Sequence, residues 1–200
     1  MRTTIVDLLP TEADPPLSVL FCGVNPGLST VETGLHFHRP GNRSWRALHL
    51  GGFTPTVLAP EEQWQLPRAG LGITALVARA TARADELSPA ELVGNVPRLT
   101  DLLARTRPAW LGFLGITAFR VAFRMPRAMI GRQTLTLAGT GVWVLPNPSG
   151  LNRRWTVEAL GDEFGRLRRE ATGDVADGAP RLQGAGGFPL CEEGLPWSRR

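Results

Sequence analysis

The chain has 200 residues, of which 42% are hydrophobic and 20% charged, and these values are typical of a globular protein with one well-buried core. Its 22 basic residues are all arginine and outnumber the 18 acidic residues, so the net charge of +4 suits an anionic partner such as a phosphate backbone. The absence of lysine excludes a lysine-dependent lyase step, since a Schiff base needs a primary amine that only the N-terminus could supply.

Cysteine content and hydropathy indicate the cellular compartment. Cys22 and Cys191 are the only cysteines, too few for a disulfide framework or for a four-cysteine zinc or iron–sulfur site. No apolar run reaches the roughly 18 residues that would suggest a membrane span, and residues 1–10 lack the basic-then-apolar order of a signal peptide. We therefore expect a cytoplasmic monomer that does not associate with membranes and needs neither a metal nor a cofactor.

In the first part of the chain, two apolar runs predict buried strands. Residues 18–22 form a short apolar run closed by Gly23, and residues 71–77 predict another strand or a buried connection. Between these runs, residues 27–42 contain three glycines and a proline, which predicts a long loop of the kind that is often functional. Residues 44–50 have apolar positions at helical spacing and precede two glycines, so they predict a helix.

The middle of the chain predicts two helices that flank a strand. Residues 88–91, Ser-Pro-Ala-Glu, have the form of a capping box, and apolar residues at helical spacing continue on one face as far as Leu103. This pattern predicts one helix. Residues 110–115 predict a strand, which a second helix from about residue 116 to residue 123 follows.

Two strands and a last helix complete the predicted domain. Residues 135–137 and 142–145 flank a Gly-Thr-Gly turn as a hairpin or two successive strands, and residues 156–169 predict an amphipathic helix. The alternation of strands and helices over residues 1–170 predicts one α/β domain with a mainly parallel sheet. Residues 171–200 are rich in glycine and cannot bury enough surface to offset chain entropy, so we expect a mostly disordered or loosely docked tail.

Two turns that follow predicted strands share an Asn-Pro sequence. Gly23-Val24-Asn25-Pro26-Gly27 ends the first strand, and Asn147-Pro148-Ser149-Gly150-Leu151 follows the last one. Because ligands of α/β folds bind outside the carboxyl ends of the strands, these two turns predict one cleft. The first turn is not a P-loop, which would need Gly-Lys-Ser/Thr, so a nucleoside triphosphate site is excluded.

These turns, read with Thr33-Gly34-Leu35-His36-Phe37 and Pro40-Gly41-Asn42-Arg43-Ser44-Trp45, resemble those of the mismatch-specific uracil-DNA glycosylases and the related thymine-DNA glycosylases. The resemblance covers roughly residues 18–170 and extends to Gly131-Arg132-Gln133-Thr134-Leu135. It implies a three-layer α/β/α domain of the uracil-DNA glycosylase type around a central, mainly parallel sheet. It also implies a monofunctional enzyme of base excision repair, which flips uracil, ethenocytosine and some thymine out of mismatched double-stranded DNA and hydrolyses the N-glycosidic bond.

For the base pocket, the resemblance implies that Asn25 hydrogen-bonds the extruded base and holds a water near the anomeric carbon, while Phe37 stacks on the pyrimidine. These roles suit the side chains, because an amide offers a donor and an acceptor together and an aromatic face binds a flipped base. A small residue at position 27, where the most active branch of the superfamily has Tyr, leaves space beside the 5-position for thymine and bulky adducts. Without the resemblance, Phe37 would be as well explained as a core aromatic residue. The other base-binding positions that the resemblance implies are Gly23, Val24, Gly27 and Asn147.

The second turn and the residues after it are implied to bind the DNA. Gly150 and Leu151, next to Ser149, would push into the duplex where the base has left, and Arg153 would contact the unpaired partner base or the adjacent backbone. Leu151 has an alternative role as a hydrophobic staple at the start of the last helix. Arg153 could instead only touch phosphate, which would position the enzyme without reading sequence.

Neither turn contains an ionisable group, whereas the most active branch of the superfamily carries an acid in the first turn and a histidine in the second. Asn25 cannot accept a proton from water, so we expect the base to depart while the water is only positioned, and we expect slow turnover.

Asp85 lies in a loop after an apolar segment and could activate the water, the alternative being a solvated charge. His36, His38 and His49 do not form a metal site, because no third ligand joins the first two.

Two other functions are compatible with the sequence. A catalytically silent DNA-damage binding protein would use the same pocket, and release of free base from a G·U duplex would separate it from an enzyme. An N-glycosidase acting on free nucleosides would need neither the Leu151 wedge nor the surplus of arginine. A comparison of uridine with a uracil-containing duplex decides between that activity and DNA repair.

Overall fold

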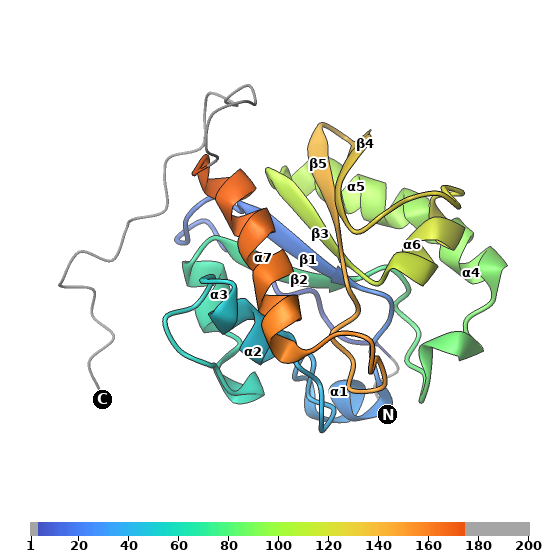
Figure 1. Cartoon of the computed structure of the whole chain (residues 1–200), viewed down its shortest axis with the longest axis horizontal. Coiled ribbons are helices and arrows are strands. Elements are labelled where there is room, and N and C mark those ends of the chain that lie inside the picture. Colours follow the sequence, from blue (N-terminus) through green and yellow to red (C-terminus); the bar gives the residue numbers. More distant parts are fainter. Residues whose placement is uncertain (1–3, 175–200) are drawn as a thin grey trace.

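The computed structural model describes residues 4–174, which form a five-stranded sheet between two layers of helices (Figure 1). The strand order is β2-β1-β3-β5-β4, in which β2, β1, β3 and β5 run parallel to one another and β4 pairs antiparallel with β5 at the edge. The strands are β1 (Val19–Gly23), β2 (Leu71–Ala75), β3 (Trp110–Leu114), β4 (Gly131–Leu137) and β5 (Thr140–Leu145). The helices are α1 (Leu28–Thr33), α2 (Ser44–Leu50), α3 (Gln65–Arg68), α4 (Pro89–Gly94), α5 (Val96–Thr106), α6 (Ile116–Ala122) and α7 (Val157–Thr172), with short 3-10 turns η1 (Pro60–Glu62) and η2 (Ala84–Glu86).

Both faces of the sheet carry a hydrophobic core, which is why the central strands are apolar along their whole length. All five residues of β2 and of β3 are buried, as expected for parallel strands covered on both sides. Helices α4, α5 and α6 cover one face, where the core includes Leu20, Leu99, Leu111, Phe113 and Phe119. Helices α2, α3 and α7 cover the other face, where it includes Phe21, Leu48, Leu66, Leu160 and Phe164. The predicted three-layer α/β/α class is confirmed.

Helices α2 and α7 approach each other closely through glycines. A Cβ added at Gly161 of α7 would lie 2.5 Å from the Cβ of Leu50, and one added at Gly51 would lie 2.6 Å from the Cβ of Phe164. Real Cβ atoms do not approach this closely in well-packed interiors, so only glycine fits at both positions. This contact fixes the C-terminal end of α2 against α7.

Several predicted elements were wrong in their extent, and β4 begins at Gly131 where the sequence predicted a strand from residue 135. The predicted loop over residues 27–42 contains the six-residue helix α1. The single helix predicted after the capping box is two helices, α4 and α5, because Pro97 lacks an amide donor and cannot continue the α4 hydrogen-bond pattern. The last helix runs past residue 169 to Thr172 and ends at Gly173 in the left-handed region, so the first residues of the predicted tail are helical.

The remainder of the predicted tail, residues 175–200, lies outside the described residues, as do residues 1–3. Within residues 4–174, none of the helices combines the length and the apolar character that crossing a membrane requires.

Candidate active site

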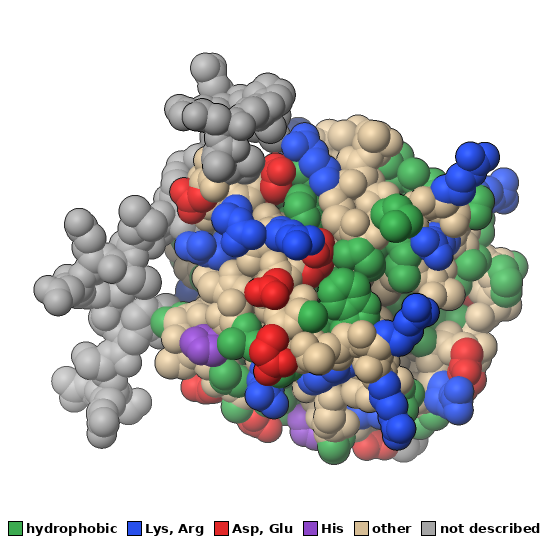
Figure 2. All heavy atoms as spheres, in the orientation of Figure 1, with side chains coloured by type: hydrophobic (Ala, Val, Ile, Leu, Met, Phe, Trp, Pro, Cys, Tyr) green, Lys and Arg blue, Asp and Glu red, His purple; other side chains and the backbone are tan. Residues whose placement is uncertain are grey.

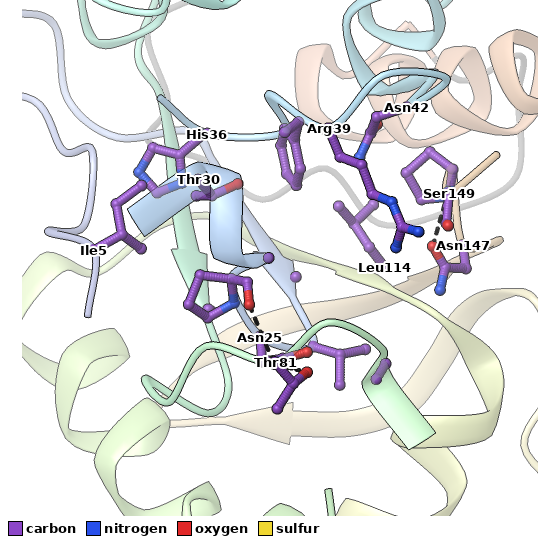
Figure 3. Close-up of a pocket in the computed structure, with 18 of the residues that line it drawn as sticks. Ile5, Asn25, Thr30, His36, Arg39, Asn42, Thr81, Leu114, Asn147 and Ser149 are labelled. Carbon is purple, nitrogen blue, oxygen red and sulfur yellow. Dashed lines mark hydrogen bonds between the residues drawn. The ribbon is translucent and has the colours of Figure 1, made fainter. Parts of the chain in front are cut away.

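The two Asn-Pro turns meet at one cavity of about 140 Å³ beyond the carboxyl ends of β1, β2, β3 and β5 (Figure 3). A cavity of about 150 Å³ holds one benzene-sized ring, so this volume suits a single six-membered base. The lining comprises the first turn with Thr30, the second turn with Leu114, the loop between α1 and α2, and the segment after β2; by residue it includes Gly23, Val24, Asn25, Pro26, Gly27, His36, Phe37, Arg39, Asn42, Thr74, Ala75, Thr81, Ala84, Asn147, Pro148 and Ser149.

The amide of Asn25 is fixed by acceptors on the wall of the cavity. Its Nδ2 donates to the Thr81 hydroxyl at 2.7 Å, to the carbonyl oxygen of Arg79 at 3.0 Å and to that of Pro26 at 3.2 Å. Because carbonyl oxygens only accept, these bonds determine which end of the amide is nitrogen. The Thr81 hydroxyl in turn donates to the Arg83 carbonyl at 2.7 Å. Among residues 4–174, Oδ1 of Asn25 has no hydrogen-bond partner, so an acceptor is what this side chain offers to a ligand or a water.

Phe37 forms an aromatic wall opposite Gly23. Its Cε1 lies 3.7 Å from the position that a Cβ on Gly23 would take, and its ring packs edge-on against Trp45 with centroids 6.3 Å apart. Its φ of 54° lies in the left-handed region, which an aromatic residue rarely adopts and which marks stored strain at many functional sites. The ring lines the cavity, is half-buried and packs on Trp45, so its structural role is observed, and its stacking on a pyrimidine stays a prediction.

His36 holds the strained residue from its N-terminal side. Its backbone N–H donates to Oε1 of Gln63 at 2.8 Å, and its Nε2 lies 3.0 Å from the Val6 carbonyl oxygen, so Nε2 carries the hydrogen. Burial lowers the pKa of the His36 imidazole, with the Val6 hydrogen bond opposing the shift, and the ring is therefore neutral near pH 7. Within the described chain, no group of three His, Cys, Asp or Glu side chains is placed to hold a metal ion.

Arg43, which the sequence pattern did not single out, ties the loop before α2 to the second turn. Its Nη2 donates to the carbonyl oxygens of Ser149 and Asn152, both at 2.8 Å, and its Nη1 donates to that of Trp155. Its backbone N–H and Nε both donate to the Pro148 carbonyl, at 3.0 and 3.3 Å. One guanidinium thus satisfies carbonyls along the whole loop that leads into α7, and its planar fork suits this geometry.

The second turn is compact, and Leu151 projects from it. The Asn147 side chain accepts from the Ser149 N–H at 2.9 Å (Figure 3), and a Cβ on Gly150 would lie 2.6 Å from the Gly41 carbonyl oxygen, so glycine is required there. Leu151 is 64% exposed. It lies well before Thr156, the N-cap of α7, so its alternative role as a helix staple was wrong.

Arg153 is exposed in the same loop. Figure 2 shows basic side chains in several separate groups across one face of the molecule, including the region of this loop, with acidic side chains between them. On this face the positive charge is therefore dispersed, and Arg153 places part of it on the loop before α7.

The structure does not bring Asp85 into the cavity. The carboxylate belongs to the short turn η2, is 63% exposed and forms an ion pair with Arg83 at 2.6 Å. The hydrogen bond from Arg83 lowers the pKa of Asp85, which weakens it as a base. Its neighbour Ala84 lines the cavity, but Asp85 does not. The geometry therefore corrects the placement of Asp85 and agrees with a solvated charge.

The sequence analysis did not name several of the lining residues, among them Ile5, Thr81 and Arg39. Ile5 reaches the cavity because the N-terminal segment pairs with β2 through Leu8 and Ile73, which exchange two backbone hydrogen bonds of 2.8 Å. Thr81 lies in a loop far along the chain from Asn25 and is recognisable only through their hydrogen bond. Arg39 lies in the loop between α1 and α2, and its Nη1 donates to the Ala82 carbonyl at 3.1 Å.

The sequence was also compared with known protein families. Residues 10–171, more than half of the chain, match the family described as the Uracil DNA glycosylase superfamily. The matched range contains the sheet, both Asn-Pro turns and nearly all of the residues that line the cavity. A match of this extent agrees with the three-layer fold and with the position of the cavity at the strand ends, and the chain belongs to the uracil DNA glycosylase superfamily.

Proposed function

We propose that the protein is a monofunctional, mismatch-specific DNA glycosylase that hydrolyses the N-glycosidic bond of uracil in double-stranded DNA during base excision repair. The observation that carries this proposal is the meeting of the Asn25 turn and the Leu151 turn at one cavity with the volume of a single ring. Membership of the superfamily supports base release from DNA as the reaction class. Mismatch specificity rests on the resemblance of the turns and on the exposed Leu151.

In this proposal the exposed side chain of Leu151 enters the duplex, and the extruded pyrimidine lies against Phe37. Unstacking costs a few kcal/mol per step, and an apolar wedge offsets that cost by filling the space the base leaves. Ser149, Gly150 and Arg153 contact the strand around the lesion. A glycosidase acting on free nucleosides has no use for an apolar side chain exposed beside its pocket.

Asn25 positions the attacking water in this mechanism. Its Nδ2 is occupied by protein acceptors, so its Oδ1 accepts a hydrogen bond from water or from the base. An amide does not take the proton, so the bond to the base breaks largely before water adds. Gly23, Val24 and Asn147 complete the wall around the base.

The pocket leaves room at the 5-position of the pyrimidine. A Cβ on Gly27 would meet only the Thr30 hydroxyl, at 3.9 Å, among the described residues. A methyl group or a fused ring therefore has space beside this glycine, which supports thymine and ethenocytosine as further substrates. We also propose that the protein acts as a cytoplasmic monomer, without a metal or cofactor, and that the catalytic domain, predicted from sequence as residues 1–170, ends with α7 at Thr172.

The test is a panel of labelled duplexes that carry uracil, thymine or ethenocytosine opposite each of the four bases, assayed under single-turnover conditions with and without alkali. We expect base release from uracil opposite guanine to be the fastest or among the fastest reactions. Equal rates of uracil release opposite guanine and opposite adenine would contradict the proposed mismatch specificity. Tight binding with no base release would favour the silent damage-binding protein.

A further inference from the structure

The charge of the cavity is unusual for a hydrolase. Among the described residues that line it, Arg39 is the only one with an ionised side chain, and carboxylates are absent from that set. His36, the other basic residue of the lining, is buried and neutral. A cavity with one cation and no carboxylate is poorly suited to deprotonating water and well suited to accommodating negative charge.

The Arg39 side chain reaches across the cavity from the loop between α1 and α2. Its Nη1 donates to the Ala82 carbonyl on the opposite wall at 3.1 Å, and Figure 3 shows the side chain extending into the cavity. This is its single hydrogen bond within residues 4–174, so its Nε and Nη2 groups remain available as donors. Arg79 and Arg83, in the neighbouring loop, are instead paired with Glu91 and Asp85. The guanidinium of Arg39 is thus anchored at one nitrogen without having its charge neutralised.

We propose that Arg39 is a catalytic residue that hydrogen-bonds a carbonyl oxygen of the extruded pyrimidine and stabilises the negative charge that the base acquires as it leaves. This inference rests on the proposed glycosylase function and assigns the residue that drives departure of the base. The Asn25 and Asn147 turns supply no ionised group for that purpose. Arg39 fills this gap from a separate loop.

The step balances without any co-reactant other than water. The bond between C1′ of the sugar and N1 of uracil breaks, and its electron pair stays on N1 and spreads over the ring oxygens. Water adds to the electron-deficient C1′ and loses a proton to solvent, while the uracil anion takes up a proton from solvent. The guanidinium keeps its own protons throughout, because arginine is not deprotonated in proteins, and it acts by charge and hydrogen bonding alone.

The competing role for Arg39 is a contact with DNA phosphate, which would fix the enzyme on the duplex without touching the base. The two roles differ in their response to the leaving group. Loss of a phosphate contact would slow base release from every substrate by the same factor. Loss of a contact that stabilises negative charge on the base would slow release most when the departing anion is unstable. It would slow release less when a substituent on the base already stabilises that anion.

The experiment compares two duplexes that carry uracil or 5-fluorouracil opposite guanine, because fluorine stabilises the departing anion. Single-turnover rates are measured for the wild type, Arg39→Ala, Arg39→Lys and Arg127→Ala, together with binding to abasic product DNA and melting temperatures. Arg127 is an exposed arginine outside the cavity and controls for loss of one positive charge. Arg39 is itself exposed, so its replacement leaves the core intact.

We expect Arg39→Ala to slow uracil release by about 10²- to 10³-fold, the usual effect of removing one donor to a developing anion. The loss for 5-fluorouracil should be several-fold smaller, Arg39→Lys should recover part of the rate, and Arg127→Ala should change both substrates slightly and equally. An equal loss for both bases, a loss confined to product binding, or an unchanged rate would each overturn the role of Arg39. Absence of base release by the wild type itself would instead overturn the proposed function.

Discussion

At the scale of single residues, hydrogen bonding determines which atoms of the site remain free to act. Asn25 uses its amide nitrogen on three protein acceptors and leaves its oxygen, while Asp85 uses its carboxylate on Arg83. The Asn25 oxygen is therefore free to bind a ligand in the cavity, whereas the Asp85 carboxylate is paired outside it. A motif in the sequence cannot show this difference, because it depends on loops that are far apart in the chain.

Asp85→Asn therefore keeps most of the activity. The substitution removes an exposed ion pair that lies outside the cavity, so we expect the rate of base release to change by no more than about two- to threefold. The measurement is single-turnover base release from a G·U duplex. A loss of 10²-fold or more, the scale on which a general base acts, would restore Asp85 as the group that activates water.

His36 makes stability depend on pH in a defined direction. Burial lowers the pKa of this side chain in the folded protein below its ordinary value of 6.5, so the unfolded chain binds a proton first as the pH falls. Its contribution to the free energy of unfolding is complete above pH 6.5 and is lost as the pH drops through the folded-state pKa.

The control variant is His36→Gln, which keeps an N–H donor for the Val6 carbonyl but does not titrate. Melting temperatures measured from pH 8 to pH 5 should fall more steeply for the wild type than for this variant. Parallel curves would show that His36 does not titrate differently in the folded and unfolded states.

At the scale of elements, the loop before α2 and the loop before α7 act as one unit because Arg43 bridges them. Arg43→Lys keeps the charge, but one ammonium group cannot reach four carbonyls. We expect this variant to slow base release from a paired duplex by at least about tenfold more than from single-stranded DNA, since a wedge matters only where stacking resists extrusion.

Leu151→Ala tests the same coupling from the other end. This variant should also slow base release more on duplex DNA than on single-stranded DNA. The rate of the double variant should fall by less than the product of the two single fold-changes, because both substitutions act through the position of Leu151. Additive losses, or equal slowing of paired and single-stranded substrates, would show that Arg43 and Leu151 act separately.

The elements that the sequence predicted well are those whose signal is local. The strands β1 and β3 are continuous apolar runs because both faces of the sheet are buried, and α4 begins at Pro89 because the capping box of its N-cap, Ser88, is complete. Helix α1 was missed because Gly27, its N-cap, makes no side-chain hydrogen bond and the first turn has no acidic residue. Of the cavity lining, the two Asn-Pro turns and Phe37 in the loop between α1 and α2 were predicted from the sequence. Thr81 and Ile5 were not, because their place in the cavity depends on tertiary contacts alone.

At the scale of the whole molecule, the chain combines an arginine surplus with a complete lack of lysine. We therefore predict that base release by this protein ends at the abasic site, because a side-chain amine that could form a Schiff base is absent from the sequence. The abasic product should accumulate and break only after alkali or heat, and borohydride should trap no covalent adduct. An adduct trapped at a residue other than Met1 would contradict this account.

Superfamily membership and the dimensions of the cavity together make base release from DNA the central claim. The most direct measurement is the single-turnover rate of uracil release from a G·U duplex by the wild type and by Asn25→Ala, with binding to abasic product DNA measured in parallel and free uridine as the alternative substrate. We predict release from the duplex and not from uridine, a loss of about 10² or more in Asn25→Ala, and nearly unchanged product binding, because Asn25 acts at the base and not on phosphate. Release from uridine at a similar rate, or an equal loss of rate and product binding in Asn25→Ala, would contradict it.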